Sequence, residues 1–172
     1  MTVHYIRGAD IADTARVLGD VELGAGVNIW YGVSIRGDVA KIVIGENTNV
    51  QDNTVIHCDK DYPNIIGPNV IIGHGALVHG EAVGEGSMVG MGARLLGHTK
   101  VGKGCIIAAG AVVPQGLVVP DGMVAMGVPA KVVRPTNAQE KKYLADIPAR
   151  YVEMARLHAE KRDDPRVRPW GS

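Results

Sequence analysis

Aliphatic side chains recur every six residues along much of this chain, and this period limits the possible folds more than any other sequence feature. The spacing is six without interruption from Val83 to Ala125. A glycine commonly follows the aliphatic residue, and a small residue commonly lies four places after it. Six matches neither the period of an amphipathic helix nor the two-residue alternation of a long strand. The pattern therefore predicts short strands separated by tight corners.

Three such strands make one triangular coil of about 18 residues, and stacked coils bury their aliphatic residues in a column. Glycine and asparagine at the corners supply the backbone freedom that tight turns need. Gly is abundant, at 23 of 172 residues, and Phe is absent, so the core must consist of aliphatic side chains. The predicted fold is an all-β solenoid, a parallel β-helix of hexapeptide repeats, over residues 1–135.

The sequence after the repeats changes character. Pro135-Thr136-Asn137 is a helix-start signal, and residues 136–160 are predicted to form a C-terminal α-helical segment. This segment is expected to pack on the solenoid or on a neighbouring subunit. Pro148 lies inside it and is expected to break it into two helices or to kink it. Residues 161–172 are charged and contain proline, which predicts an extended or disordered tail.

Charge and cysteine content exclude several classes of protein. Lys+Arg and Asp+Glu are equal at 18 each, and this balance argues against nucleic-acid binding. No apolar run approaches membrane-spanning length, and the N-terminus shows no secretory signal. Cys58 and Cys105 are too few for a disulfide framework. We therefore expect a cytoplasmic protein with reduced thiols, without a nucleic-acid or membrane partner.

The six-residue period is interrupted three times, and irregularities in a regular solenoid are where loops and sites tend to lie. Two interruptions insert residues and the third removes one. They fall between Ile35 and Ile44, between Ile56 and Ile66, and between Val78 and Val83.

Two of the six histidines occupy equivalent positions on adjacent predicted coils. His57 follows Ile56, and His79 follows Val78, where Ile56 and Val78 end the third strand of successive coils. Neighbouring coils lie about 4.8 Å apart, so these side chains should stack along one edge. Two imidazoles at that separation can share a zinc-like ion. The register therefore predicts half of a metal site.

His74 is close in sequence but does not fit that edge. It lies two places after Ile72, on the preceding face, and five residues before His79. A neighbouring copy packed around a threefold axis brings it to the same ion more easily than its own chain does. Three neutral nitrogen ligands leave one position open for water, which is the arrangement of catalytic zinc. The prediction is an intersubunit metal site. The other histidines, His4, His98 and His158, show no such register and are interpreted as structural or surface residues.

Over nearly its whole length the chain resembles the γ-class carbonic anhydrase family. The resemblance implies a left-handed β-helix and a homotrimer with metal sites at its interfaces. It implies zinc as the metal, with iron or cobalt as alternatives, and reversible hydration of CO2 to bicarbonate by a metal-bound hydroxide. The matching segments are Arg36-Gly37-Asp38, Asn49-Val50-Gln51-Asp52, His57, Gly73–Gly80 and Ala149-Arg150-Tyr151-Val152.

The resemblance also implies roles for individual residues. Gln51 matches the residue that orients the metal-bound water, and Tyr151 matches a helix residue that reaches the pocket. An Arg36–Asp52 pair across subunits is expected from this match. The residues matched to interface or supporting positions are Arg36, Asp38, Asn49 and Asp52.

The chain departs from the archaeal prototype of that family in two places. Val39 stands where a Glu follows Arg-Gly-Asp, and the stretch 58–63 lacks the Glu that shuttles protons. Asp59 and Asp61 are alternative shuttles, but a solvated turn is the preferred interpretation for both. Losing the shuttle affects the rate more than metal binding, because turnover requires the proton to leave.

Two other functions stay open at this point. Hexapeptide-repeat acyltransferases that use an acyl-CoA donor employ one histidine as general base, which His57 or His79 supplies alone. The three-ligand register counts against that reading, because a base needs no partners at metal distance. The other alternative is a non-catalytic metal-binding or assembly subunit of the same fold.

Overall fold

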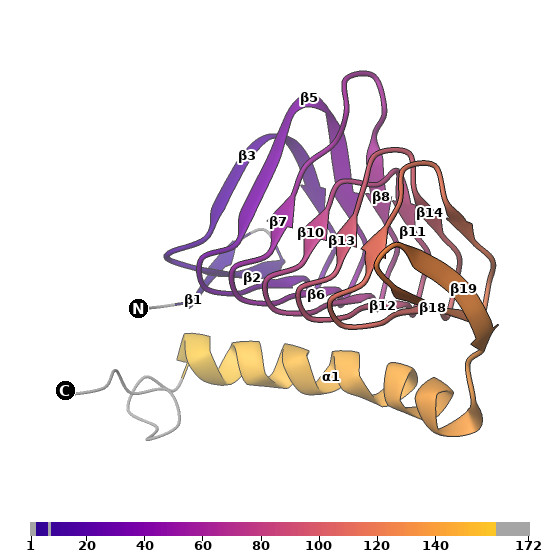
Figure 1. Cartoon of the computed structure of the whole chain (residues 1–172). Coiled ribbons are helices and arrows are strands. Elements are labelled where there is room, and N and C mark those ends of the chain that lie inside the picture. Colours follow the sequence, from indigo (N-terminus) through magenta and orange to yellow (C-terminus); the bar gives the residue numbers. More distant parts are fainter. Residues whose placement is uncertain (1–2, 7, 161–172) are drawn as a thin grey trace.

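The structure, a computed structural model, describes residues 3–6 and 8–160, with side chains described from Gly8 onward. The chain winds into a parallel β-solenoid, and one helix, α1 (Ala138–Glu160), lies along the outside of it (Figure 1). The predicted class, a left-handed β-helix of hexapeptide repeats with a C-terminal helix, is confirmed. The helix runs back along the solenoid, so its C-terminal end lies beside the first coils.

Within the described residues the strands form two sheets, and the second covers two faces of the triangular coil. The first sheet has the order β1 (Val3–Ile6), β2 (Ala9–Ala12), β4 (Asn28–Ile29), β6 (Asn49–Val50), β9 (Ile71–Ile72), β12 (Met88–Val89), β15 (Ile106–Ile107), β18 (Met123–Gly127), β19 (Ala130–Pro135). The second has the order β16 (Val112–Val113), β13 (Arg94–Leu95), β10 (Leu77–Val78), β7 (Val55–Ile56), β5 (Ser34–Ile44), β8 (Asn64–Ile66), β11 (Ala82–Val83), β14 (Lys100–Val101), β17 (Val118–Val119). β3 (Arg16–Leu23) pairs with β5.

The aliphatic positions of the six-residue repeat form the core. Ile35, Ile56 and Val78 are all 0% exposed, and parallel pairing aligns Ile35 with Ile56 and Ile56 with Val78. Each such side chain contributes about 1.5–3 kcal/mol by leaving water. At the N-terminal end the column is less complete, because Val17 and Leu23 are only partly buried.

The first interruption of the repeat is a strand extension, not a loop. β5 continues through Arg36, Gly37 and Asp38 as an eleven-residue strand, and β3 pairs with it across a register shift between Gly19 and Val21. The backbone pairing absorbs the extra residues, which the six-residue period by itself did not indicate. The second interruption is a loop closed by an isolated bridge between Asp59 and Tyr62.

Helix α1 begins where the sequence predicted. Asn137 caps it: the Glu140 amide donates to Asn137 Oδ1 at 2.9 Å, and the Asn137 amide donates to Glu140 Oε2 at 2.8 Å. The first alternative at Pro148, a break into two helices, is wrong, because α1 is one 23-residue helix through that residue. The other alternative, a kink, stays a prediction. Pro148 and Leu144 are buried against the solenoid, and this packing offsets the hydrogen bond that proline cannot make. The tail predicted for 161–172 lies outside the described residues.

Two further expectations concern membranes and thiols. No helix in the described part of the chain is long and apolar enough to cross a membrane. Cys58 and Cys105 are buried and unpaired with each other. Burial raises the pKa of both thiols, so both are protonated at neutral pH.

Candidate metal centre

His57 and His79 lie one above the other on the edge that follows β7 and β10. The ring centroids are 5.2 Å apart and the ring planes are inclined by 37°. The backbone fixes this stacking: the His57 amide donates to Val78 O at 3.1 Å, and the His79 amide donates to Leu95 O at 3.0 Å. We call this pair the histidine edge. The register therefore places both rings side by side as the sequence predicted, while their role as metal ligands stays a prediction.

Each ring of the histidine edge contacts a carboxylate from one of the two insertions. His57 Nε2 lies 3.0 Å from Asp38 Oδ1, on the extension of β5, and His79 Nε2 lies 3.0 Å from Asp59 Oδ1, in the second insertion. The hydrogen bonds from His57 and then Arg36 lower the pKa of Asp38, and the bond from His79 lowers that of Asp59. Both insertions thus bring negative charge to this edge.

Arg36 takes part in this arrangement within its own chain. Its Nη1 donates to Asp38 Oδ2, so the guanidinium, Asp38 and His57 form one connected group. Asp52 lies at another corner and contacts His74 instead. The pair expected between Arg36 and Asp52 belongs to a contact between chains and stays a prediction.

His74 lies at the corner between the first sheet and β10, directly above Asp52. His74 Nδ1 is 2.9 Å from Asp52 Oδ2, and the His74 amide donates to Gln51 Oε1 at 3.2 Å. The imidazole is half exposed, at 47% of the side chain. A carboxylate on one ring nitrogen is how proteins fix the tautomer of a metal-ligating histidine and aim its other nitrogen. We call this group, His74 with Asp52 and Gln51, the oriented corner.

The oriented corner and the histidine edge are two different corners of the same coil. The five residues from His74 to His79 run along β10, and an extended segment of that length spans about 16 Å. Among the residues that the structure describes, no group of three or more His, Cys, Asp or Glu side chains is placed to hold a metal. The donor chemistry fits a metal site on both sides, with two stacked imidazoles on one and an oriented imidazole on the other. A site with all three histidines therefore requires a second chain.

The remaining predicted residues lie around the oriented corner. Gln51 is 5% exposed, and Asn49 is 0% exposed with its Nδ2 donating to Asn28 Oδ1 at 2.5 Å. Asn49 is thus buried within its own chain, and its interface or supporting role stays a prediction. Tyr151, on α1, packs edge-on against Trp30 with ring centroids 6.1 Å apart. Burial, then the charges of Tyr143 and Asp52, raise the pKa of Tyr151.

The structure adds a group at this corner that the sequence did not reveal. Tyr31 Oη lies 3.0 Å from His158 Nδ1, and the His158 ring meets Trp30 edge-on with centroids 4.9 Å apart. His158 was interpreted as structural or surface. The sequence could have indicated Tyr31, because Tyr31, Asp52 and His74 occupy the same repeat position in three successive coils. It could not have indicated His158, because only the packing of α1 brings it there.

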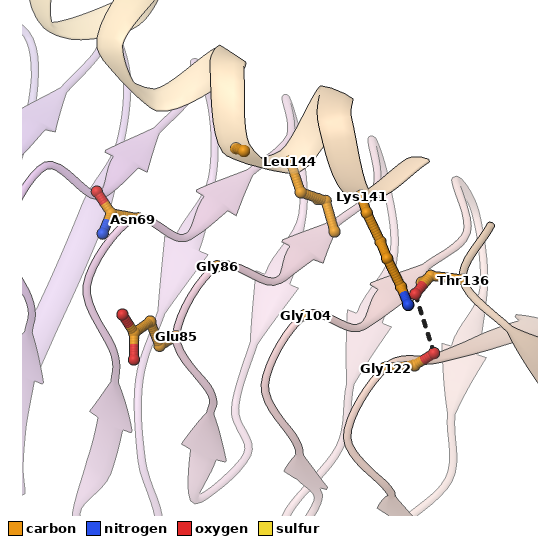
Figure 2. A pocket seen from close by; sticks show the side chains of 9 residues that line it. Asn69, Glu85, Gly86, Gly104, Gly122, Thr136, Lys141 and Leu144 are labelled. Carbon is orange, nitrogen blue, oxygen red and sulfur yellow. Dashed lines mark hydrogen bonds between the residues drawn. The ribbon is translucent and has the colours of Figure 1, made fainter. Parts of the chain in front are cut away.

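A groove of about 530 Å³ opens on the other side of α1, at the third corner of the coil. Figure 2 shows Lys141 reaching from α1 toward Thr136 and Gly122, whose carbonyl accepts from Thr136 Oγ1 at 3.1 Å. No histidine lines this groove, so it is separate from both histidine corners. Its lining is Asn69, Glu85, Gly86, Gly104, Gly122, Thr136, Lys141, Leu144 and Ala145.

Comparisons with known proteins agree with the repeat architecture. The family model described as bacterial transferase hexapeptide (six repeats) matches residues 82–115. Solved structures with the same fold include a hexapeptide transferase family protein of Anaplasma phagocytophilum (TM-score 0.83, 38% identity, 88% of this chain and 89% of that one). Another is a Bacillus cereus protein whose description as an acetyltransferase is provisional (TM-score 0.85, 36% identity, 88% of both chains). The protein is thus a hexapeptide-repeat β-helix protein.

Relatives by sequence narrow this class. A probable carbonic anhydrase of Methanocaldococcus jannaschii is 44% identical over 84% of this chain and 91% of its own length. A carbonic anhydrase of Geobacillus kaustophilus is 39% identical over 91% and 86%. The mitochondrial γ carbonic anhydrase 2 of Arabidopsis thaliana is 41% identical over 88% of this chain, which spans 56% of that protein. The chain belongs to the γ-class carbonic anhydrase family.

Proposed function

We propose that this protein is a metal-dependent carbonic anhydrase that reversibly hydrates CO2 to bicarbonate at the interfaces of a homotrimer. One observation supports this most: Asp52 orients the half-exposed His74 at one corner while His57 and His79 stack at another. Each corner is an incomplete donor set, and a neighbouring copy that brings its His74 to the histidine edge completes it. Membership of the γ-class family supports the same activity.

Each part of the divided site has its own task in this proposal. A divalent ion held by the three imidazoles supplies the Lewis acidity that allows water to ionise near neutral pH. Asp52 keeps the His74 proton on Nδ1, which leaves the Nε2 lone pair for the ion. Gln51, which is buried and touches the His74 backbone, is the proposed polar group that orients the attacking water. Tyr151, which packs on Trp30 from α1, is the second residue with a proposed catalytic role.

CO2 hydration by the metal-loaded protein tests this proposal. His74→Ala is expected to lose both the metal and the activity, because one of three ligands is gone. His98→Ala is the matched control, since His98 Nδ1 also pairs with a carboxylate, Glu81, at 3.0 Å but belongs to neither corner. Equal hydration rates in the His74→Ala protein and the wild type would contradict the proposal. So would a metal content below about a third of an ion per chain.

The metal, the assembly and the location are part of the same proposal. Zinc is the first choice, with iron and cobalt as alternatives, because a three-imidazole site accepts several divalent ions. Metal analysis of protein purified without added metal identifies the native ion, and sedimentation equilibrium determines whether three chains associate. We place the protein in the cytoplasm, which fractionation of the source cells checks.

A second candidate function is acyl transfer, which the acetyltransferase name of the structurally similar Bacillus cereus protein favours. In that case one histidine of the histidine edge acts alone as general base. Calorimetric titration with acetyl-CoA separates the two functions. Binding that survives both metal removal and His74→Ala supports acyl transfer, because a single base needs neither the ion nor the third imidazole.

A further inference from the structure

A chain of polar and aromatic side chains leads away from the oriented corner toward the end of α1. Tyr31, Asp52 and His74 occupy the same position of three successive coils: the Asn53 amide donates to Tyr31 O and the Gly75 amide to Asp52 O, each at 2.9 Å. Tyr31 and His74 are thus two coil spacings apart, about 10 Å. Tyr31 Oη then reaches His158 Nδ1 at 3.0 Å.

Burial acts on the titratable side chains between this corner and α1. Burial raises the pKa of Tyr31 and Tyr151 and lowers the pKa of His158, and the Asp52 carboxylate acts on all three. Burial favours the neutral imidazole, whereas Asp52 favours the imidazolium. His158 and Tyr31 are both partly exposed, and the His158 ring contacts the Tyr31 hydroxyl. Burial is the larger of the two effects, so the pKa of His158 lies below its ordinary value.

We propose that Tyr31 and His158 form the route by which the proton leaves the site, taking the place of the glutamate shuttle that this chain lacks. The inference rests on the proposed CO2 hydration, which releases one proton for each bicarbonate formed. Tyr31 Oη accepts a proton from water on the Asp52 side as its own hydroxyl proton passes to His158 Nδ1. The imidazolium then gives a proton to a buffer base, which returns His158 to its neutral form.

This role differs from that of the acids on the histidine edge. Asp59, the alternative shuttle from the sequence, is engaged by His79, and Asp61 lies in the turn of the second insertion with a positive φ of 67°. The Tyr31–His158 pair lies at the other corner, and α1 carries His158 away from it.

Steady-state CO2 hydration by the full-length, metal-loaded protein tests the inference. His158→Phe keeps a ring against Trp30 but holds no proton, and Tyr31→Phe removes only the hydroxyl. Both are expected to lower kcat by about 10²-fold in dilute buffer and to leave kcat/KM for CO2 unchanged, because proton exit follows CO2 attack. Added imidazole should restore kcat in both. Met154→Ala, on the same helix and 39% exposed, is the control for changes in α1.

A second readout does not depend on turnover. NMR titration of the His158 ring should show a midpoint below the ordinary value for histidine, and Tyr31→Phe should shift it. In the active wild type the pH midpoint of kcat should follow the His158 midpoint. Wild-type hydration with an unchanged kcat in His158→Phe overturns this inference alone. A metal-loaded wild type that hydrates no CO2 overturns the proposed function and this inference together, and a kcat loss that imidazole does not rescue also overturns the route.

Discussion

The histidine edge and the oriented corner provide imidazoles in two different ways. On the edge, backbone pairing between successive coils sets two rings 5.2 Å apart, and acids from the two insertions contact them. At the corner, a single half-exposed ring is held by its neighbours in the repeat, Asp52 and Gln51. The edge thus provides two stacked imidazoles of one chain, whereas the corner provides a single oriented imidazole.

The largest expected effect tests whether the three metal ligands come from two different chains. His57→Ala and His74→Ala should each abolish metal binding in a homogeneous protein, because each removes one of three ligands. Unfolding, mixing and refolding the two variants together should restore metal in part of the population, since some interfaces then combine an intact edge with an intact corner. Metal content per chain after refolding is the measurement. Absence of any recovery, with normal assembly of the mixture, would show that the ligands come from one chain.

The second prediction concerns the core beneath the edge. Ile56→Ala should lower the free energy of unfolding by about 2–5 kcal/mol, because the substitution leaves a cavity in the core. Ile56 is 0% exposed and directly precedes His57. Urea unfolding followed by circular dichroism measures it. Val118→Ala, at an outward position that is 59% exposed, is the control and should change the stability by less than about 0.5 kcal/mol.

The third prediction tests how the corner aims His74. Asp52→Asn should weaken metal affinity by about 10–100-fold without loss of the fold, because the carboxylate that orients the imidazole is gone. Competition with a metal-binding dye gives the affinity. Glu153→Gln, a similar charge loss on the exposed surface of α1, should have no effect. A ten-fold loss in the control as well would mean that overall charge, not orientation, is responsible.

The fourth prediction compares the stability of α1 with that of the strands of the histidine edge. Asn137→Ala should cost about 1 kcal/mol, because it removes the cap of α1. Hydrogen exchange should then speed up in α1, which packs against β6 and β9, more than in β7 and β10, which precede the two histidines of the edge. The control is Gln139→Ala, in the first turn of α1. Asn69→Ala would not serve as a control, because Asn69 has a positive φ of 55°.

The smallest expected effect is a pH dependence at the same cap. Hydrogen bonds from Arg134 and then from the Asn137 backbone lower the pKa of Glu140 from 4.5 to about 2. Because the folded value lies below the unfolded one, the stabilisation is complete above about 4.5 and is lost as the pH falls through about 2. Protection of the first turn of α1 against hydrogen exchange should fall over this range. Glu140→Gln should show low protection at both ends, and an unchanged pH dependence in that variant would assign the effect elsewhere.

Much of the fold was predictable because its information is local and periodic. The six-residue repeat identifies the buried positions, and Ile35, Ile56 and Val78 lie in the core accordingly. The break expected at Pro148 was wrong, because burial against the solenoid outweighs the local cost of proline. The extension of β5 was also not predictable, since its pairing with β3 depends on a register shift that no period describes.

The sequence by itself determined the coil, its aliphatic column and the stacking of His57 on His79, because a strict repeat turns spacing along the chain into position in space. It also indicated that His74 belongs to another corner. Only the tertiary structure decided that Asp52 and Gln51 orient His74 and that both insertions direct acids to the edge. The position of His158 beside Tyr31 was likewise decided by tertiary packing, since α1 joins residues 127 positions apart. Contacts of that kind depend on how a helix lies on the solenoid, which no local pattern records.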